Sequence, residues 1–187
     1  MIDLCGEESF GTSSSHAREK DGLWAVLFWL NLQAVTGKDV GEIVRDHWRQ
    51  FGRHAYCRND YFITDAEKAA AVMARLEKQV ESMSGDCFGK LTIDEADSFT
   101  YVDPVDGSES RRQGIRVFFI DGSRIIYRLS GTGTSGATLR VYLETYLEDP
   151  ASHVQDAATA TSALAGASRD IACIEDMTGL SEPTGIV

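Results

Sequence analysis

The chain has 187 residues, enough for one domain with a core, or for one domain and part of a second. Apolar residues make up 43% and charged residues 25%, which is typical of globular proteins and excludes disordered, collagen-like and mucin-like chains. The net charge of −11 argues against a large nucleic-acid interface. Eight acids and one base lie between Val141 and Val187, so an anion site elsewhere must be built from local groups.

The four cysteines show no CxxC spacing, which argues against zinc and redox sites and suits reduced thiols in the cytosol. The first residues, MIDLCGEES, lack the basic and apolar regions of a signal peptide. The most apolar stretch, 23–35, is shorter than the roughly 20 residues that span a bilayer. It is apolar nearly all round, which predicts a buried helix. We therefore expect a cytoplasmic protein with no membrane partner.

The first fifty residues predict two helices after a short, irregular start. Residues 1–11 are expected to be a strand end and a glycine-bounded turn, and residues 12–20 a polar loop. Helices are expected over about 21–36 and 39–51, each ended by a glycine. Neither the first strand nor the apolar helix has a neighbouring sheet to pair with or pack on. The chain therefore looks as if it begins in the middle of a domain.

The next segment predicts a strand over 56–63 and a helix over 65–83. Thr64 and Glu67 have the spacing of a capping box at the start of this helix. Apolar residues at helical spacing define its buried face: Ala69, Val72, Met73, Leu76, Val80 and Met83.

Strands and further helices follow. Four strands are expected, over about 90–94, 98–102, 115–120 and 124–129. Asp121-Gly122 is a strong hairpin signal. A Gly-rich loop at 130–136 is expected to open a helix over 135–147, and the Ala-rich segment 152–178 another, weakened by Gly166. Leu139, Tyr142, Leu143, Tyr146 and Leu147 are expected on one face of the helix over 135–147. The order of elements predicts an α+β fold with an antiparallel sheet flanked by helices.

The segment 128–140 contains a glycine pattern that resembles a dinucleotide fingerprint. Gly131, Gly133 and Gly136 match G-x-G-x-x-G. The fingerprint requires a parallel βαβ unit, whereas here the preceding strand is expected to belong to a hairpin. The spacing is therefore not taken as evidence for a dinucleotide site.

The chemistry of the same loop favours a phosphate monoester site. The glycines allow close approach of the backbone, and the N-terminus of the expected helix would supply free N–H groups. Arg128 and Arg140 flank the loop and could bind a phosphate through two N–H groups each. Hydroxyl donors are offered by Ser130, Thr132 and Thr134. The alternative is a plain Gly/Ser/Thr turn with two surface arginines.

The segment 6–20 offers a second set of polar groups. Glu7 and Ser9 could hold sugar hydroxyls, while His16, Arg18 and Lys20 could bind an anion or donate a proton. The alternative is an acidic turn followed by a solvated basic loop. Paired carboxylates also suggest a glycosidase or a metal site. No second cluster supports a metal, because two acidic groups are interpreted as turn residues: Asp94, Glu95 and Asp97, and Asp103 with Asp106.

These motifs carry a family resemblance. The run GEESFGTSSSHAREKDGLWAVLFWL at 6–30 resembles the sugar-binding segment of phosphoglucomutases, in the α-D-phosphohexomutase superfamily. The run DGSRIIYRLSGTGTSGATLRVYLETY at 121–146 resembles the phosphate-binding loop of their C-terminal domain. DPVDGS at 103–108 and the final EPTGIV fit the same family. GEESFG is similar to the phosphoglucomutase branch rather than to phosphomannomutases.

The resemblance implies a domain organisation. The family has four domains and chains about three times longer, and neither its TASHNPGG-type phosphoserine loop nor its DGDGDR-type magnesium loop occurs in this sequence. It implies a remnant of the sugar-binding third domain at 1–37, a linker helix at 38–54 and the C-terminal phosphate-binding domain at 55–187. The expected fold is therefore the α+β C-terminal domain preceded by an incomplete α/β domain.

The resemblance also implies a reaction. A phosphoserine exchanges a phosphoryl group with glucose 1-phosphate or glucose 6-phosphate through glucose 1,6-bisphosphate, with Mg²⁺. Glu7 and Ser9 would hold the sugar, and Lys20, with His16 and Arg18, would line the reacting end and serve in proton transfer or charge stabilisation. The phosphate that is not transferred would be held by Arg128, Ser130, Gly131, Thr132, Gly133, Thr134 and Arg140.

Three further expectations follow from the resemblance. The chain holds no cofactor itself, and alone it is expected to have no mutase activity. Its partners would be glucose phosphates, the N-terminal domains of the same protein and, through the apolar helix 21–36, other copies of itself. The alternative is a non-enzymatic phosphoglucomutase-like scaffold in adhesion or secretion.

Overall fold

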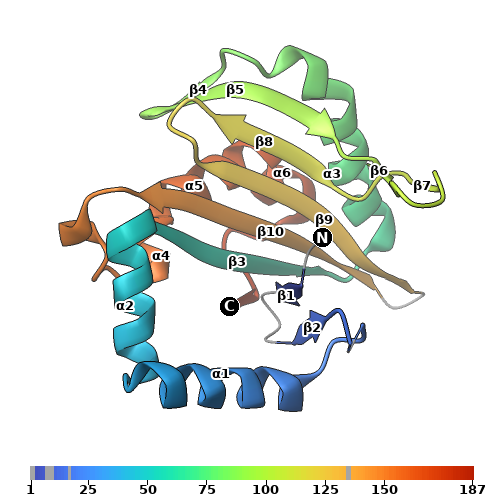
Figure 1. The fold of residues 1–187 in the computed structure, drawn as a ribbon. Helices are drawn as coiled ribbons and strands as arrows, with labels where there is room; N and C mark the ends of the chain where they lie inside the picture. Colours follow the sequence, from blue (N-terminus) through green and yellow to red (C-terminus); the bar gives the residue numbers. More distant parts are fainter. Residues whose placement is uncertain (1–2, 7–10, 17, 134–135) are drawn as a thin grey trace. The chain divides into compact units, whose positions relative to one another are not determined.

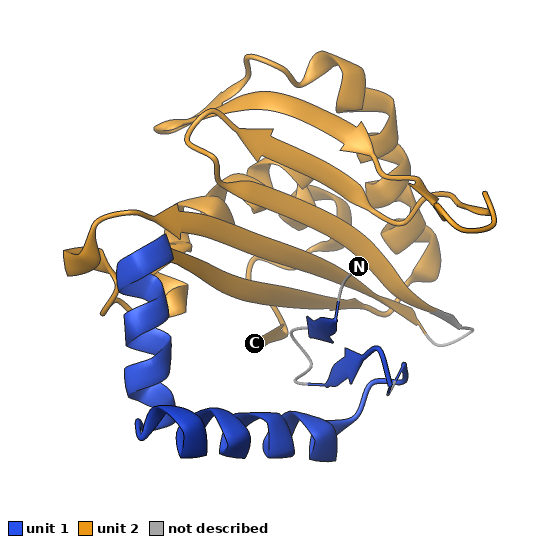
Figure 2. Cartoon of the chain, viewed as in Figure 1, with its two compact units in different colours: residues 1–51 blue, residues 52–187 orange. Residues whose placement is uncertain are grey.

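A computed structural model describes residues 3–6, 11–16, 18–133 and 136–187 of the chain. The chain divides into two compact units, Met1–Phe51 and Gly52–Val187, which are coloured separately in Figure 2. Each unit is described by itself below. The sequence boundaries were drawn at residues 37 and 54, whereas helix 40–51 belongs to the first compact unit.

The first unit has a small strand pair and two helices. β1 (Leu4–Gly6) pairs antiparallel with β2 (Thr12–Ser14), so the predictions of a loop at 12–20 and of an unpaired first strand were wrong. α1 (Gly22–Thr36) and α2 (Val40–Phe51) confirm both predicted helices. Asp21 caps α1, because its carboxylate accepts from Leu23 N at 2.7 Å and from Trp24 N at 3.1 Å.

The prediction that α1 is buried was wrong for this chain. No residue of α1 is buried, and Leu23 and Val35 are 77% and 83% exposed. The helix is apolar on every side, and its neighbours in this unit, β2 and α2, do not cover all of those sides. No helix in the described residues is long and apolar enough to span a membrane.

The second unit is built on a seven-stranded antiparallel sheet with the strand order β11-β3-β10-β9-β8-β5-β4, and β6 and β7 form a separate hairpin (Figure 1). Its strands are β3 (Arg53–Ile63), β4 (Cys87–Phe88), β5 (Leu91–Ser98), β6 (Tyr101–Val102), β7 (Glu109–Ser110), β8 (Ile115–Phe119), β9 (Arg124–Gly133), β10 (Gly136–Leu147) and β11 (Gly185–Ile186). Its helices are α3 (Ala66–Gln79), α4 (Ala157–Ala160), α5 (Ser162–Ala172) and α6 (Ile174–Thr178), with 3₁₀ turns at Val80–Ser82 and Pro150–Ser152. The predicted α+β class is confirmed.

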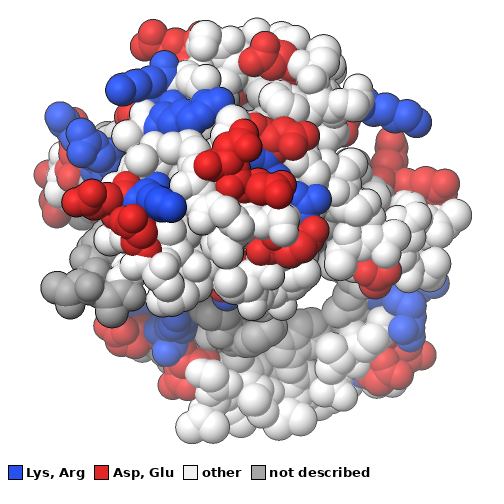
Figure 3. Space-filling model, turned by 180° about the vertical axis from the view of Figure 1, so that it is seen from behind, with Lys and Arg blue, Asp and Glu red and all other residues white. Residues whose placement is uncertain are grey.

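The core of this unit lies between the sheet and the helices α3, α5 and α6, which lie behind the sheet in Figure 1. Alternate strand residues point into it, as the period of two requires. The largest fully buried side chains include Tyr61, Leu76, Ile93, Ile115, Ile125, Tyr127, Leu139, Leu143 and Ile174. Tyr127 Oη donates to the carbonyl of Ser168 at 2.9 Å, which ties β9 to α5. On the helix side, acidic and basic side chains are interspersed (Figure 3).

The predicted helix over 135–147 is wrong, because this segment is the central strand β10. The error came from grouping Leu139 with Tyr142 and Leu143 at helical spacing. The buried set instead alternates with a period of two: Ala137, Leu139, Val141 and Leu143. β10 pairs with β3 on one side and β9 on the other, and that environment favours its β-branched and aromatic residues.

Other predicted elements needed smaller corrections. The stripe of α3 is confirmed, but Asp65 rather than Thr64 caps it, accepting from Glu67 N at 2.9 Å. The hairpin at Asp121-Gly122 is confirmed between β8 and β9. The predicted strand 98–102 is divided between the end of β5 and β6. The Ala-rich segment is interrupted at Cys173, which has φ of 47°, rather than at Gly166.

Candidate functional site

Four polar residues meet on the β9–β10 hairpin. Arg128 of β9 lies directly opposite Arg140 of β10, and Ser130 lies opposite Thr138. The intervening residue Leu139 is buried in the core, so all four side chains stand on the opposite face of the sheet, here called the outer face. Two guanidinium groups and two hydroxyls therefore form a rectangle on two neighbouring strands. We call these four residues the hairpin site.

The outer face carries five arginines, and their pairing differs. Three form ion pairs with carboxylates: Arg58 with Asp60, Arg116 with Asp97 and Arg124 with Glu144. The side chains of Arg128 and Arg140 have no hydrogen bond or ion pair with any described residue. Two adjacent uncompensated positive charges are unfavourable unless an anion joins them, which makes the hairpin site the candidate anion site.

Arg140 is the more enclosed of the two arginines. Its Nε atom is buried and has no hydrogen-bond partner among the described residues. Its neighbour on the other side is Asp60 of β3. Asp60 is itself held by Arg58, which donates from Nε at 2.9 Å and from Nη2 at 3.1 Å. The structure therefore leaves Arg140 beside an acid whose charge is already matched by another arginine.

The backbone at the end of the hairpin needs glycine. Gly131 and Gly136 have φ of 73° and 111°, and a Cβ on Gly136 would lie 2.8 Å from the carbonyl oxygen of Ile63. Thr134 lies outside the described residues, and of Thr132 and Gly133 only the backbone, in β9, is described. Because β10 is a strand, the expected helix N-terminus does not exist here, and any anion must be held by side chains and hairpin backbone.

The opposite end of the outer face is fully paired. Glu144 is buried, and its carboxylate contacts Arg124 Nε and, at 2.7 Å, His54 Nδ1. Burial and, secondarily, the Glu144 carboxylate raise the pKa of Tyr56 above its ordinary value. This cluster satisfies its own charges, so it offers nothing to a ligand.

The other predicted site residues lie in the first unit. The loop 13–20 is closed by mutual hydrogen bonds between Thr12 and Asp21, with Asp21 N donating to Thr12 O at 3.1 Å. His16 Nδ1 lies 3.0 Å from Ser14 Oγ, and the ring meets Trp24 edge-on with centroids 4.6 Å apart.

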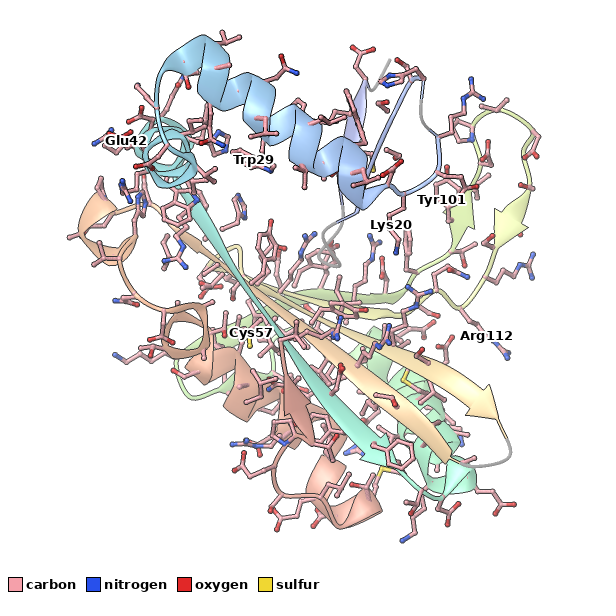
Figure 4. The ribbon with its side chains drawn as sticks, turned by 90° about the horizontal axis from the view of Figure 1, so that it is seen from below. Lys20, Trp29, Glu42, Cys57, Tyr101 and Arg112 are labelled. Atoms are coloured by element: carbon pink, nitrogen blue, oxygen red, sulfur yellow. The ribbon has the colours of Figure 1, made fainter. Side chains whose placement is uncertain are left out.

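Lys20 lies just before Asp21, the N-cap of α1 (Figure 4), and it lies over Gly11, where a Cβ would come within 1.9 Å of Lys20 Cγ. Arg18 and His16 are exposed in the same loop. The structure thus brings His16, Arg18 and Lys20 together in one closed loop. Glu7 and Ser9 lie outside the described residues.

The acidic groups form no metal site in the described part of the chain, where no three His, Cys, Asp or Glu side chains could hold an ion. Asp103 and Asp106 lie in turns as predicted, accepting from Val105 N at 2.7 Å and Ser108 N at 2.8 Å. Asp94, Glu95 and Asp97 were wrongly assigned to a turn. They lie in β5, where Asp97 accepts from Arg116 Nε at 2.8 Å.

Sequence analysis missed two residues of the anion site. Thr138 joins the hairpin site because it pairs with Ser130, and Asp60 lies beside Arg140. The period-two alternation of buried residues around 138–142 was the available signal for Thr138. No local pattern points to Asp60, which comes from a strand almost eighty residues earlier.

Comparisons with known proteins cover both units. The family described as "Phosphoglucomutase-1, C-terminal domain" matches residues 53–184. "Phosphoglucomutase/phosphomannomutase, alpha/beta/alpha domain III" matches residues 1–51. The phosphoglucomutase of Rhizobium radiobacter is 49% identical over 185 residues, and phosphoglucomutase-1 of Homo sapiens is 46% identical over 191. Each comparison covers 99% of this chain and 34% of the relative.

A solved structure gives the same result. The open form of the exocytosis-sensitive phosphoprotein pp63/parafusin, a phosphoglucomutase from Paramecium, matches with a TM-score of 0.87 and 44% sequence identity. The match covers 100% of this chain and 33% of that one. The chain thus spans about a third of the length of the relatives that it matches. It belongs to the phosphoglucomutase family, and its two units correspond to a segment of domain III and to the C-terminal domain.

Proposed function

We propose that this chain is the substrate-recognition part of a cytoplasmic phosphoglucomutase that interconverts glucose 1-phosphate and glucose 6-phosphate through glucose 1,6-bisphosphate. The observation that carries this proposal is the hairpin site, where Arg128 and Arg140 stand side by side without acidic partners among the described residues. A sugar phosphate supplies the missing dianion. A non-enzymatic scaffold has no need of such a site, which favours the enzyme over the scaffold.

In this proposal the hairpin site holds the phosphate that is not transferred. Arg128 and Arg140 donate to its oxygens from two directions, and Ser130 and Thr138 donate from their hydroxyls. Backbone N–H groups around Gly131 and Gly133 complete the set, together with the hydroxyls of Thr132 and Thr134. The role of these residues is to orient the sugar, so that the oxygen on either carbon 1 or carbon 6 of glucose can be presented to the reacting group.

The first unit is proposed to recognise the sugar and the reacting end. Glu7 and Ser9 would accept and donate hydrogen bonds to hydroxyls of glucose. Lys20, with His16 and Arg18 in the same loop, would stabilise charge or hold a proton at the transferring phosphate. Mg²⁺ and the phosphoserine, which supply the phosphoryl-transfer chemistry, belong in this proposal to parts of the protein outside this sequence.

The first experiment is a phosphate titration of the chain followed by amide NMR at constant ionic strength. We expect binding on the order of millimolar, because the sugar contacts are not engaged, with shifts clustered at 128–140. Arg128→Ala should remove these shifts. Arg116→Ala is the matched control, since Arg116 stands on the same face but is paired with Asp97. Shifts spread over the surface and unchanged by Arg128→Ala would contradict the proposal.

The second experiment addresses activity. In a coupled assay with glucose 1-phosphate, glucose 1,6-bisphosphate and Mg²⁺, we expect the chain alone to give only background, because the proposed nucleophile is not in it. Robust magnesium-dependent turnover by the pure chain would overturn the assignment of the transfer chemistry to other parts of the protein.

A further inference from the structure

A pocket in the second unit adjoins the hairpin site and shares one residue with it, Arg128. It has a volume of about 740 Å³ and is lined by one side of α3, by Ser98 at the end of β5, by residues 112–115 and by Arg128 and Leu129 of β9. Its apolar lining includes Met73, Ala74 and Leu129. Pockets that hold small organic ligands have roughly this volume and are mostly apolar with a few polar groups.

The charged groups of the pocket are not balanced within it. Glu77, which accepts a hydrogen bond from Ser98 Oγ at 3.0 Å, is the one carboxylate of the lining, whereas Lys78, Arg112 and Arg128 bring three positive charges. Lys78 and Arg112 line the same pocket, and neither side chain has an ion pair or hydrogen bond with another described residue. In a chain with a net charge of −11, two such cations at one hollow favour an anion.

Arg112 is held in place by its surroundings. Its φ of 55° is unusual for a residue with a side chain and persists only where neighbouring contacts fix it. Two backbone hydrogen bonds provide that fixation: Phe99 N donates to Gly114 O at 2.8 Å, and Gln113 N donates to Phe99 O at 2.9 Å. Figure 4 shows Arg112 extending from this loop.

Arg111 shows that pairing is available in the same loop. Its guanidinium donates from Nη2 to Glu109 at 2.8 Å and from Nε at 2.9 Å. The next residue, Arg112, has no such acid and is directed to the pocket lining instead. The loop therefore neutralises one arginine and presents the other.

We propose that this pocket binds a small anionic amphiphile, an aromatic or acyl group that carries a phosphate or carboxylate. The apolar group lies on Met73, Ala74 and Leu129, and the anion lies between Lys78 and Arg112. This pocket shares Arg128 with the proposed glucose phosphate site, but it takes a different ligand, because glucose phosphates have no apolar group to place on Met73, Ala74 and Leu129.

The test uses 1-naphthyl phosphate as the probe on the full chain, with 2-naphthol and inorganic phosphate for comparison. We expect naphthyl phosphate to shift amides at 73–78 and 112–115 and to bind at least tenfold more tightly than either comparison compound. Lys78→Glu with Arg112→Glu should weaken binding at least tenfold. Lys68→Glu with Arg111→Glu, an equal charge change on the same helix and loop outside the pocket lining, is the matched control and should have little effect.

Two further variants locate the probe. Ala74→Phe fills the pocket from an exposed helix position and should abolish the shifts at 112–115. Arg140→Ala removes the hairpin site and should leave naphthyl phosphate binding unchanged, so failure of one site does not imply failure of the other. The proposal is overturned if the charge-reversed variant binds as the wild type does, if 2-naphthol binds equally well, or if the shifts appear only at 130–140, outside the pocket lining.

Discussion

The two ends of the outer sheet face differ in whether their arginines are paired with carboxylates. At one end, Arg124 shares the buried carboxylate of Glu144 with His54, and every charge is compensated within the unit. At the other end, Arg128 and Arg140 lie opposite each other with no acid assigned to them among the described residues. The first arrangement stabilises the fold, and the second leaves two arginines available to bind an anion. Mutations at the two ends should therefore separate stability from affinity.

The largest effect is expected for Arg140→Ala. Loss of a charge-assisted contact of about 1.5–3 kcal/mol should weaken phosphate binding roughly 10- to 150-fold. Stability should change by less than about 0.5 kcal/mol, because Arg140 Nε already lacks a partner in the described structure. Phosphate titration and urea unfolding measure the two quantities. A large loss of stability with unchanged affinity would reverse the assignment of this end.

Glu144→Gln is the complementary change at the paired end. It leaves Arg124 and His54 without the carboxylate that they share, and we expect the free energy of unfolding to fall by about 2 kcal/mol. This is less than is usual for a broken buried pair, because Arg124 and His54 both reach solvent. Phosphate affinity should stay within about twofold. Asp97→Asn, which breaks the more exposed pair with Arg116, is the control and should cost less than about 1 kcal/mol. Equal destabilisation by both variants would show that burial of Glu144 contributes nothing.

A smaller effect on phosphate binding is expected for a change at Asp60, the acid beside the hairpin site. Asp60 is neighbour to Arg140 and partner of Arg58, so Asp60→Asn removes a negative charge beside the hairpin site. At about 6 Å in water-like surroundings this charge should oppose phosphate by about 0.7 kcal/mol. We therefore expect binding to tighten about threefold at low salt and the gain to vanish at high salt. Weaker binding at both salt concentrations would instead mean that Asp60 positions Arg140.

The smallest effect concerns alkaline pH. Burial raises the pKa of Tyr127 well above 10 and, with Glu144 as a further cause, raises the pKa of Tyr56. A raised folded-state pKa means that this contribution to stability is complete below about pH 10 and is lost as pH rises beyond it. Tyr56→Phe should make the alkaline loss slightly shallower without changing phosphate binding at neutral pH. Unfolding curves at several pH values above 9 measure this loss. If stability falls with pH as steeply in Tyr56→Phe as in the wild type, the proposed contribution of Tyr56 is contradicted.

The sequence was sufficient for the elements that have strong local signals. Asp21 and Gly37 bound α1, and Asp121-Gly122 joins β8 to β9, because these residues act on their own backbone. β10 was misassigned because its aromatic residues fit a helical period as well as they fit the outer face of a strand. The sheet decides between the two periods, and its pairing with β3 joins residues about eighty positions apart.

The site was predictable to a similar degree. The arginines and hydroxyls of 128–140 were identified from their chemistry and from the family resemblance, whereas their arrangement as a rectangle depends on the strand register. That Arg128 and Arg140 lack acidic partners could not be known without the positions of Asp60, Asp97 and Glu144. Pairing across strands is set by the tertiary fold, so it cannot be predicted from any short stretch of the sequence.

The double pairing of β10 has a consequence for exchange of its amide protons with solvent. Residues 137–147 are paired with β3, and residues 138–144 also with β9, so β10 has no free edge along that length. Local opening of one neighbour leaves the hydrogen bonds to the other intact, so deuterium should enter the middle of β10 only when the whole unit unfolds. The backbone that carries Arg140 is thus among the slowest-exchanging parts of the chain, and its amide provides an internal gauge of global stability in every variant.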